Sequence, residues 1–215
     1  MQSEIKRIVV FLLILILVSG CAAFPKEELA RVGDLPNTSQ YKHKPSAFVE
    51  VVFYHGLPDK NPTELSQVKD KIVPMVEGAI KKSGLFSSYT LDASAKSEQD
   101  YTIKINIYNH SDNEGAAFVM GFISGFTFGV IPATGTDNYT LKLQAIDKEG
   151  RALGEYQNKD AIQTWVGIWF IPVMGNTIEK AVNTTLENQI MVALKELLES
   201  GKLKYSSTKN FLPAV

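Results

Sequence analysis

The sequence holds a single cysteine and three histidines, and its charges nearly cancel; each of these shortages excludes a class of function. With Cys21 alone, no disulfide can form within the chain. A net charge of −1 over 215 residues provides no global field that attracts nucleic acid, so no nucleic-acid partner is expected. The histidines, His43, His55 and His110, have no metal-ligand spacing with another ligand, so neither a metal nor a cofactor is expected.

Recognisable catalytic motifs are also missing. The glycine-rich stretch GFISGFTFG, 121–129, lacks the Lys and the Ser or Thr of a phosphate-binding loop. No G-x-S-x-G nucleophile motif occurs. We therefore interpret the chain as non-enzymatic.

The N-terminus has the organisation of a secretory signal peptide. Lys6 and Arg7 precede an apolar run of eleven residues, Ile8 to Val18, which is short of the roughly 20 residues that span a bilayer. Val18-Ser19-Gly20-Cys21 then resembles the bacterial lipobox. The resemblance implies removal of residues 1–20 and a diacylglycerol on the Cys21 sulfur, with an acyl chain such as palmitate on the new amine. An ordinary signal peptide followed by a buried cysteine is the alternative.

Residue 22 bears on the location of such a lipoprotein. Ala22 is not the Asp that resembles an inner-membrane retention signal. In a Gram-negative cell, the resemblance therefore implies an outer-membrane lipoprotein that faces the periplasm.

Beyond Cys21, the composition divides the chain into three parts. Residues 21–45 mix proline, glycine and charge without an apolar period, which predicts a lipidated tether. Residues 46–201 predict an α+β domain, and residues 202–215 a C-terminal tail. Apolar alternation predicts strands, and helical periodicity between capping residues and terminal glycines predicts two amphipathic helices. The strands are expected at 46–55, 85–91, 101–109, 139–147 and 151–158, and the helices at 61–84 and 176–201. This order is typical of a mainly antiparallel sheet.

Two uncharged inserts, 115–134 and 161–176, interrupt this pattern. No charge occurs between Glu114 and Asp137, a run of 22 residues, and the second insert contains both tryptophans. As a helix, the first run would be about 33 Å long, close to the thickness of the bilayer hydrocarbon. If the flanking strands pair antiparallel, both inserts leave the sheet at the same end.

The conformation and the environment of the first insert stay open at this point. Small residues at every fourth position, ending before Pro132, favour a helix with a smooth stripe, whereas phenylalanines at even positions favour a hairpin. Either form suits a membrane-facing surface, a protein interface or burial against the sheet. The residues expected to contact membrane or partner are Ala117, Phe118, Gly121, Phe122, Gly125, Phe126, Gly129, Trp165, Trp169 and Phe170.

The order of lipobox, tether, a strand and helix ending in KKSGLF, and two inserts around a strand pair resembles the curli-secretion-channel type of envelope lipoprotein. In that family, comparable insertions form the transmembrane hairpins of an oligomeric pore. The first insert here is more uniformly apolar than a pore hairpin, whose lumen face alternates with polar residues.

We therefore expect an envelope lipoprotein that serves assembly or transport. Its expected partners are membrane lipid and, for a protein interface, further copies of this chain or other envelope proteins. The alternative is a periplasm-facing module that binds lipid or peptide, in which the inserts are buried or close a pocket.

Overall fold

The protein is described from a computed structural model covering residues 20–33, 35, 36, 38, 41–111, 120, 124, 127 and 130–207, together with Glu4 and Arg7. It has an α+β fold with one main sheet, in the strand order β1-β8-β7-β6-β3-β4, and with β5 paired to β3. A second, two-stranded sheet joins β2 to β9. The strands are β1 (Gly20–Pro25), β2 (Tyr41–His43), β3 (Ser46–His55), β4 (Thr63–Glu64), β5 (Ser88–Thr90), β6 (Tyr101–His110), β7 (Ala133–Asp147), β8 (Ala152–Gly167) and β9 (Ser206–Ser207).

The described residues fall into two compact units. Unit 1 contains residues up to Lys26, 110–138 and 161–185, and unit 2 contains residues 27–109, 139–160 and 186 onward. Strands β7 and β8 therefore contribute to both units.

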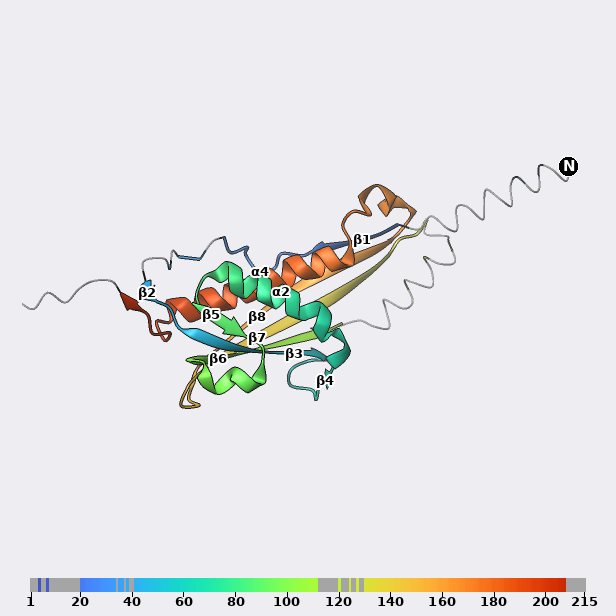
Figure 1. Cartoon of the computed structure of the whole chain (residues 1–215). Coiled ribbons are helices and arrows are strands. Elements are labelled where there is room, and N and C mark those ends of the chain that lie inside the picture. Colours follow the sequence, from blue (N-terminus) through green and yellow to red (C-terminus); the bar gives the residue numbers. More distant parts are fainter. Residues whose placement is uncertain are drawn as a thin grey trace, which may run out of the picture. The chain divides into compact units, whose positions relative to one another are not determined.

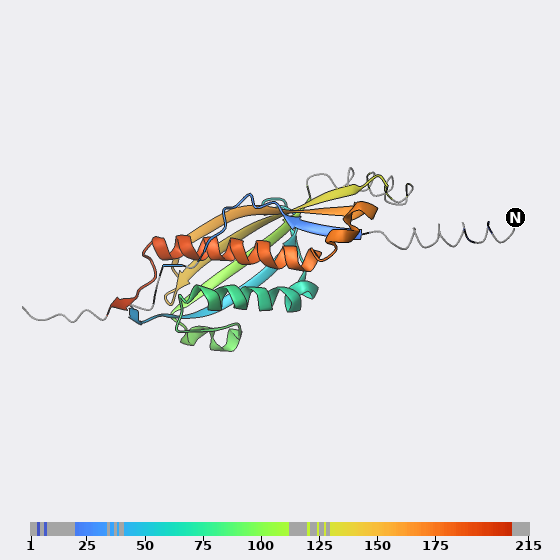
Figure 2. The ribbon, with the colours of Figure 1, turned by 90° about the horizontal axis from the view of Figure 1, so that it is seen from above.

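In unit 2, two helices cover one face of the sheet (Figures 1 and 2). They are α2 (Lys69–Ser83) and the part of α4 (Ile178–Glu199) from Leu186 onward. Lys82 Nζ on α2 lies 2.6 Å from Glu187 Oε1 on α4, so the two helices are neighbours. Three short 3-10 segments are also described: η2 (Ser66–Val68), η3 (Ala93–Glu98) and η4 (Ile168–Val173).

The core of unit 2 follows from the alternation of side chains along the strands. Residues of β3 and β6 with odd numbers share one face, because Val49 is opposite Ile103 and Val51 is opposite Ile105. These side chains are buried under the helices, which contribute the buried residues Ile72, Val76, Ala79, Ile80, Leu186, Ile190, Leu194 and Leu197.

A buried polar residue joins α4 to the sheet. Gln189 is fully buried, and its Nε2 donates to the Tyr139 carbonyl oxygen at 3.0 Å. The Asn158 side chain donates in turn to the Gln189 carbonyl oxygen at 2.8 Å. These bonds link α4 to both β7 and β8.

Pairing in the sheet is mixed. β1 with β8 and β3 with β4 are antiparallel, as the sequence predicts for most of the sheet, but β3 runs parallel to β5 and β6. The helix α2 between β3 and β6 provides the crossover that a parallel pair requires.

The predicted start of α2 at Asn61 is wrong. Thr63 and Glu64 instead form β4 against β3, and the Leu65 N–H donates to the Phe53 carbonyl oxygen at 2.9 Å. The helix begins only at Lys69, because the preceding residues are drawn into the edge of the sheet. It then continues through Pro74 and ends at Gly84, which has the predicted left-handed conformation (φ 61°).

The segments expected to form a tether and a tail also contain structure. Gly20–Pro25 is strand β1, and Tyr41–His43 pairs with Ser206–Ser207. Tyr41 and Tyr205 stack with ring centroids 4.6 Å apart. Their partners lie far along the sequence, so local composition did not reveal them.

The second insert begins as a continuation of the sheet. β8 extends to Gly167 and is followed by η4, so residues 161–167 are strand rather than a separate insert. The helix after it begins at Ile178, where the Thr177 hydroxyl oxygen, rather than the expected Asn176, accepts the Lys180 N–H at 3.2 Å.

Candidate membrane-contact site

Cys21, the predicted lipidation site, lies in an edge strand of unit 1. Cys21 is opposite Val166 in the antiparallel pair of β1 and β8, so the two side chains project to the same face. Ala22 and Ala23 are 0% and 2% exposed, whereas Cys21 is exposed. The sulfur is thus accessible for modification, while the two residues after it are packed.

The hydrogen bonds of β1 show which way the Cys21 amide faces. The Lys26 N–H donates to the Ala161 carbonyl oxygen at 2.8 Å, so every second residue back from Lys26 bonds to β8. The N–H of Ala23, at an intervening position of the strand, points away from β8 and donates at 2.8 Å to the Asn176 carbonyl oxygen. Cys21 lies two residues before Ala23 in the strand, so its nitrogen also points away from β8. Pro25, two residues after Ala23, faces the same way. It lacks an N–H, which limits pairing of this edge of β1 with a further strand.

Gly20 has no room for a side chain. A Cβ placed there would lie 2.5 Å from the Ile171 nitrogen and 2.7 Å from the Phe170 carbonyl carbon. The start of β1 therefore packs directly on the backbone of η4.

The exposed apolar side chains gather in the same unit. Within the described part of the chain, all the large hydrophobic residues that are exposed belong to unit 1. They include Trp169, the most exposed at 64%, and three members of the segment from Ile171 to Met174. We call them the exposed apolar set: Val130, Ile131, Val166, Trp169, Ile171, Val173, Met174 and Ile178.

Trp169 joins the described parts of the two inserts. Its indole Nε1–H donates to the Val130 carbonyl oxygen at 2.9 Å. Trp165 and Phe170 instead stack on each other, with ring centroids 5.5 Å apart, and both are half-buried. Three of the predicted contact residues are therefore found in one unit, but only Trp169 is well exposed.

The other predicted contact residues lie outside the described residues: Ala117, Phe118, Gly121, Phe122, Gly125, Phe126 and Gly129. Of the first insert, Met120 and Ser124 are described and are helical. No helix in the described ranges is long and apolar enough to cross a bilayer.

Sequence reasoning missed most of the exposed apolar set, because it selected aromatic residues and glycines. Ile171, Val173 and Met174 lie in the uncharged run 161–178, and that run was the signal that could have identified them. Ile178 keeps the apolar period of the last helix, but it is 51% exposed, since it occupies the first turn of α4.

No set of three or more His, Cys, Asp or Glu side chains that could hold a metal ion occurs among the residues described. The described part of the site therefore offers exposed apolar surface and one thiol.

Comparison with known proteins finds no matching family model and no matching curated protein. Among solved structures, the chain is similar to PelC from Paraburkholderia phytofirmans, described as a dodecamer, with 13% identity over 83% of this chain and 96% of that chain, at a TM-score of 0.37. It is similar to a minor lipoprotein from Acinetobacter baumannii (10% identity, 76% and 96% coverage, TM-score 0.37). It is also similar to a DUF4136 family protein from Bacteroides thetaiotaomicron (11% identity, 86% and 98% coverage, TM-score 0.27). At these TM-scores, the likenesses carry no functional conclusion.

Proposed function

We propose that this protein is a non-enzymatic envelope lipoprotein, anchored through Cys21, whose exposed apolar set rests against the same membrane. The observation that carries the proposal is that the exposed lipobox cysteine and every exposed large hydrophobic side chain in the described residues belong to one compact unit. A lipid anchor and an apolar surface in one unit can act on one bilayer.

The register of β1 supports a short anchor. The lipidated residue is itself part of the packed strand, so no flexible spacer separates the acyl chains from unit 1. Acyl chains on the Cys21 sulfur would leave from the face that carries the exposed Val166. The Cys21 nitrogen points away from β8, so its acylation would not disturb the pairing of the two strands.

Energetics also favour docking. Full burial of a large apolar side chain contributes about 1.5–3 kcal/mol, and members of the exposed apolar set are 37–64% exposed, so four of them would contribute about 3–6 kcal/mol on docking. The uncharged run 161–178 provides no Lys or Arg, so attraction to anionic lipid is not required. We place the protein in the outer membrane facing the periplasm, because Ala22 is not the Asp of a retention signal. Assembly or transport in the envelope is the role that fits such a surface.

The alternative, in which the inserts close a ligand pocket, has less support. Two pockets formed by described residues, of about 800 and 660 Å³, are lined by unit 2 and include no member of the exposed apolar set.

The decisive experiment removes the acyl chains at Cys21 and leaves the exposed apolar set unchanged. A Cys21→Ser protein, exported with a conventional signal peptide, should still float with zwitterionic vesicles, and high salt should not release it, since apolar attraction is not screened. A folded Cys21→Ser protein that stays entirely in solution would refute docking and leave the acyl chains as the sole membrane contact.

A further inference from the structure

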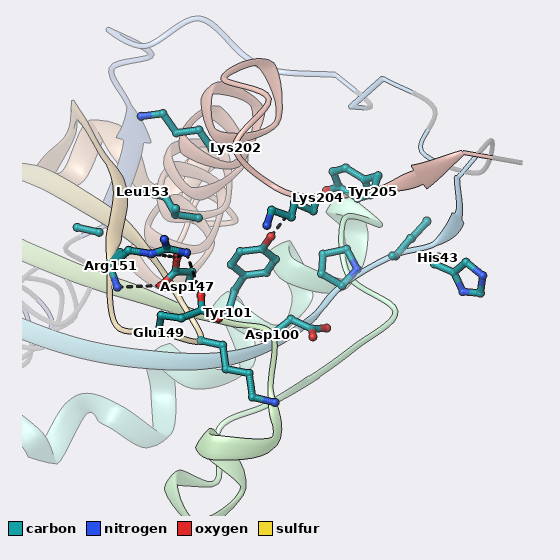
Figure 3. A pocket seen from close by; sticks show the side chains of 14 residues that line it. His43, Asp100, Tyr101, Asp147, Glu149, Arg151, Leu153, Lys202, Lys204 and Tyr205 are labelled. Carbon is teal, nitrogen blue, oxygen red and sulfur yellow. Dashed lines mark hydrogen bonds and ion pairs between the residues drawn. The ribbon is translucent and has the colours of Figure 1, made fainter. Parts of the chain in front are cut away.

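Several segments of unit 2 converge on a pocket of about 800 Å³ (Figure 3). They are the β2–β3 connection at 43–45, the start of β6 at Tyr101, the β7–β8 turn from Asp147 to Leu153, and the chain after α4 at 202–205. A volume of this size is within the range of about 300–1,000 Å³ that is typical of ligand sites.

The acidic groups of the pocket are already engaged. Arg151 donates through Nε to Asp147 Oδ2 at 2.7 Å and through Nη2 to Glu149 Oε2 at 3.0 Å. Asp100 Oδ2 accepts the Ser46 N–H at 2.7 Å and the Ser46 hydroxyl at 3.0 Å. These carboxylates are therefore occupied by the protein's own donors.

Two tyrosine hydroxyls, in contrast, retain a hydrogen to donate. Tyr101 is 6% exposed, and its hydroxyl oxygen accepts the Lys204 N–H at 3.0 Å, so its own O–H is left for another acceptor. The Tyr205 hydroxyl oxygen is buried and has no hydrogen-bond partner among the described residues. Burial raises the pKa of Tyr205, so this hydroxyl stays protonated at neutral pH. The Tyr205 hydroxyl is closed off from solvent, which leaves Tyr101 as the tyrosine donor for a ligand oxygen in the pocket.

The basic groups of the pocket are in excess. Five Lys or Arg and three Asp or Glu line it, which gives a net charge of +2 with histidine neutral. Lys148, Lys202 and Lys204 are exposed, and none forms an ion pair within the described part of the chain. They come from the β7–β8 turn and from the segment after α4, so their charges are distributed over the rim rather than focused on one point.

We propose that this pocket binds an acidic oligosaccharide, with carboxylate groups at the lysines and a sugar oxygen at the Tyr101 hydroxyl. The unpaired ammonium groups and the Tyr101 hydroxyl select an acceptor-rich ligand, and the distribution of the ammonium groups selects several separated charges over a single small anion. The choice of a glycan, rather than another polyanion, rests on the proposed envelope location.

The test uses the acylated full-length protein in nonionic detergent, titrated calorimetrically with oligogalacturonate at low salt. We expect saturable binding that weakens as salt is added, and no binding of a neutral maltooligosaccharide of equal length. Changing Lys148, Lys202 and Lys204 to Glu should lower the affinity about tenfold or more. Changing Lys71, Lys81 and Lys159 to Glu makes the same change in net charge at exposed positions outside the pocket and should alter the affinity less than twofold.

Tyr101→Phe separates the pocket from general charge attraction. It should weaken oligogalacturonate binding about threefold or more and leave the salt dependence unchanged, because only a neutral donor is lost. Equal effects of the two lysine triples, equal binding of the neutral glycan, or binding of inorganic phosphate alone would each overturn the proposal. Membrane docking is measured separately with vesicles, so either proposal can fail while the other stands.

Discussion

The indole N–H of Trp169 donates to the Val130 carbonyl oxygen at 2.9 Å, although Trp169 itself is 64% exposed. An exposed tryptophan in water does not need an internal partner for its N–H. In hydrocarbon, however, an unpaired donor costs several kcal/mol. This bond lets the ring enter the apolar part of a bilayer with its polar group already satisfied.

The first prediction therefore concerns Trp169. On addition of zwitterionic vesicles to Cys21→Ser protein, the tryptophan emission should shift to shorter wavelength, and brominated acyl chains should quench it. Trp169→Phe should abolish most of this response while binding persists. Retention of the full response in Trp169→Phe would assign it to Trp165 and contradict insertion of Trp169.

Trp169→Glu should weaken vesicle binding by about a hundredfold or more, because it removes a side chain worth up to about 3 kcal/mol and adds a carboxylate that hydrocarbon disfavours. Gln157→Glu is the matched control: it makes the same change in charge at an exposed position of β8 in unit 2. A similar loss for both variants would indicate charge repulsion rather than apolar docking. Circular dichroism on each sample establishes that the variants are folded.

The second prediction concerns processing. Intact mass of protein extracted from membranes should show a chain that begins at Cys21 and carries acyl groups. Cys21→Ser behind its native signal sequence should lack this mass and stay uncleaved, since the lipobox requires the thiol. Detection of an unmodified Cys21 in the membrane-extracted protein would remove the anchor from the proposal.

The third prediction tests β1. Ala22 is fully buried, so Ala22→Asp should detach the strand and make the chain after Lys26 at least about tenfold more sensitive to trypsin. Ala22→Ser, which adds a small uncharged group, should have a much smaller effect. If residues 21–26 formed a flexible tether, the wild-type protein would already be cleaved at the rate of the Asp variant.

The fourth prediction concerns the β7–β8 turn. Burial opposes ionisation of Asp147, but hydrogen bonds from the Arg151 N–H (2.8 Å) and guanidinium (2.7 Å) outweigh it and lower its pKa. Ionised Asp147 should therefore stabilise the folded protein above the ordinary aspartate pKa of about 3.9. This stabilisation should be lost as pH falls through the lower pKa that Asp147 has in the folded protein. NMR titration of the carboxyl carbon should place its pKa below the ordinary value, and Arg151→Gln should move it upward. An unchanged pKa in Arg151→Gln would contradict this assignment.

The fifth prediction concerns Gln189. Gln189→Ala removes the hydrogen bond to the Tyr139 carbonyl oxygen and leaves a cavity in the core, so it should lower the free energy of unfolding by about 2–4 kcal/mol. Glu196→Ala, at an exposed position of the same helix, should change it by less than about 0.5 kcal/mol. Urea denaturation of both variants provides the comparison, and equal midpoints would refute a structural role for Gln189.

Local patterns in the sequence predicted the elements whose stability is local. β3 has the predicted bounds, and β6 and α4 agree to within a few residues, because alternation and helical periodicity reflect which side chains face the core. The lipidation of Cys21 stays a prediction, based on a lipobox-like pattern of four consecutive residues. Trp169 was identified from its residue type and its uncharged surroundings.

The sequence by itself determined the α+β class and the uncharged runs, and its lipobox-like pattern predicted an anchor at Cys21. Only the tertiary structure decided that β3 pairs parallel to β6, that Cys21 lies in a packed edge strand opposite Val166, and that four distant segments form the pocket around Tyr101. It also decided that α2 begins at Lys69, because pairing of Thr63 and Glu64 with β3 overrides their local helical signal. Strand partners and pocket walls depend on contacts between residues far apart in the chain, and local composition does not encode such pairings.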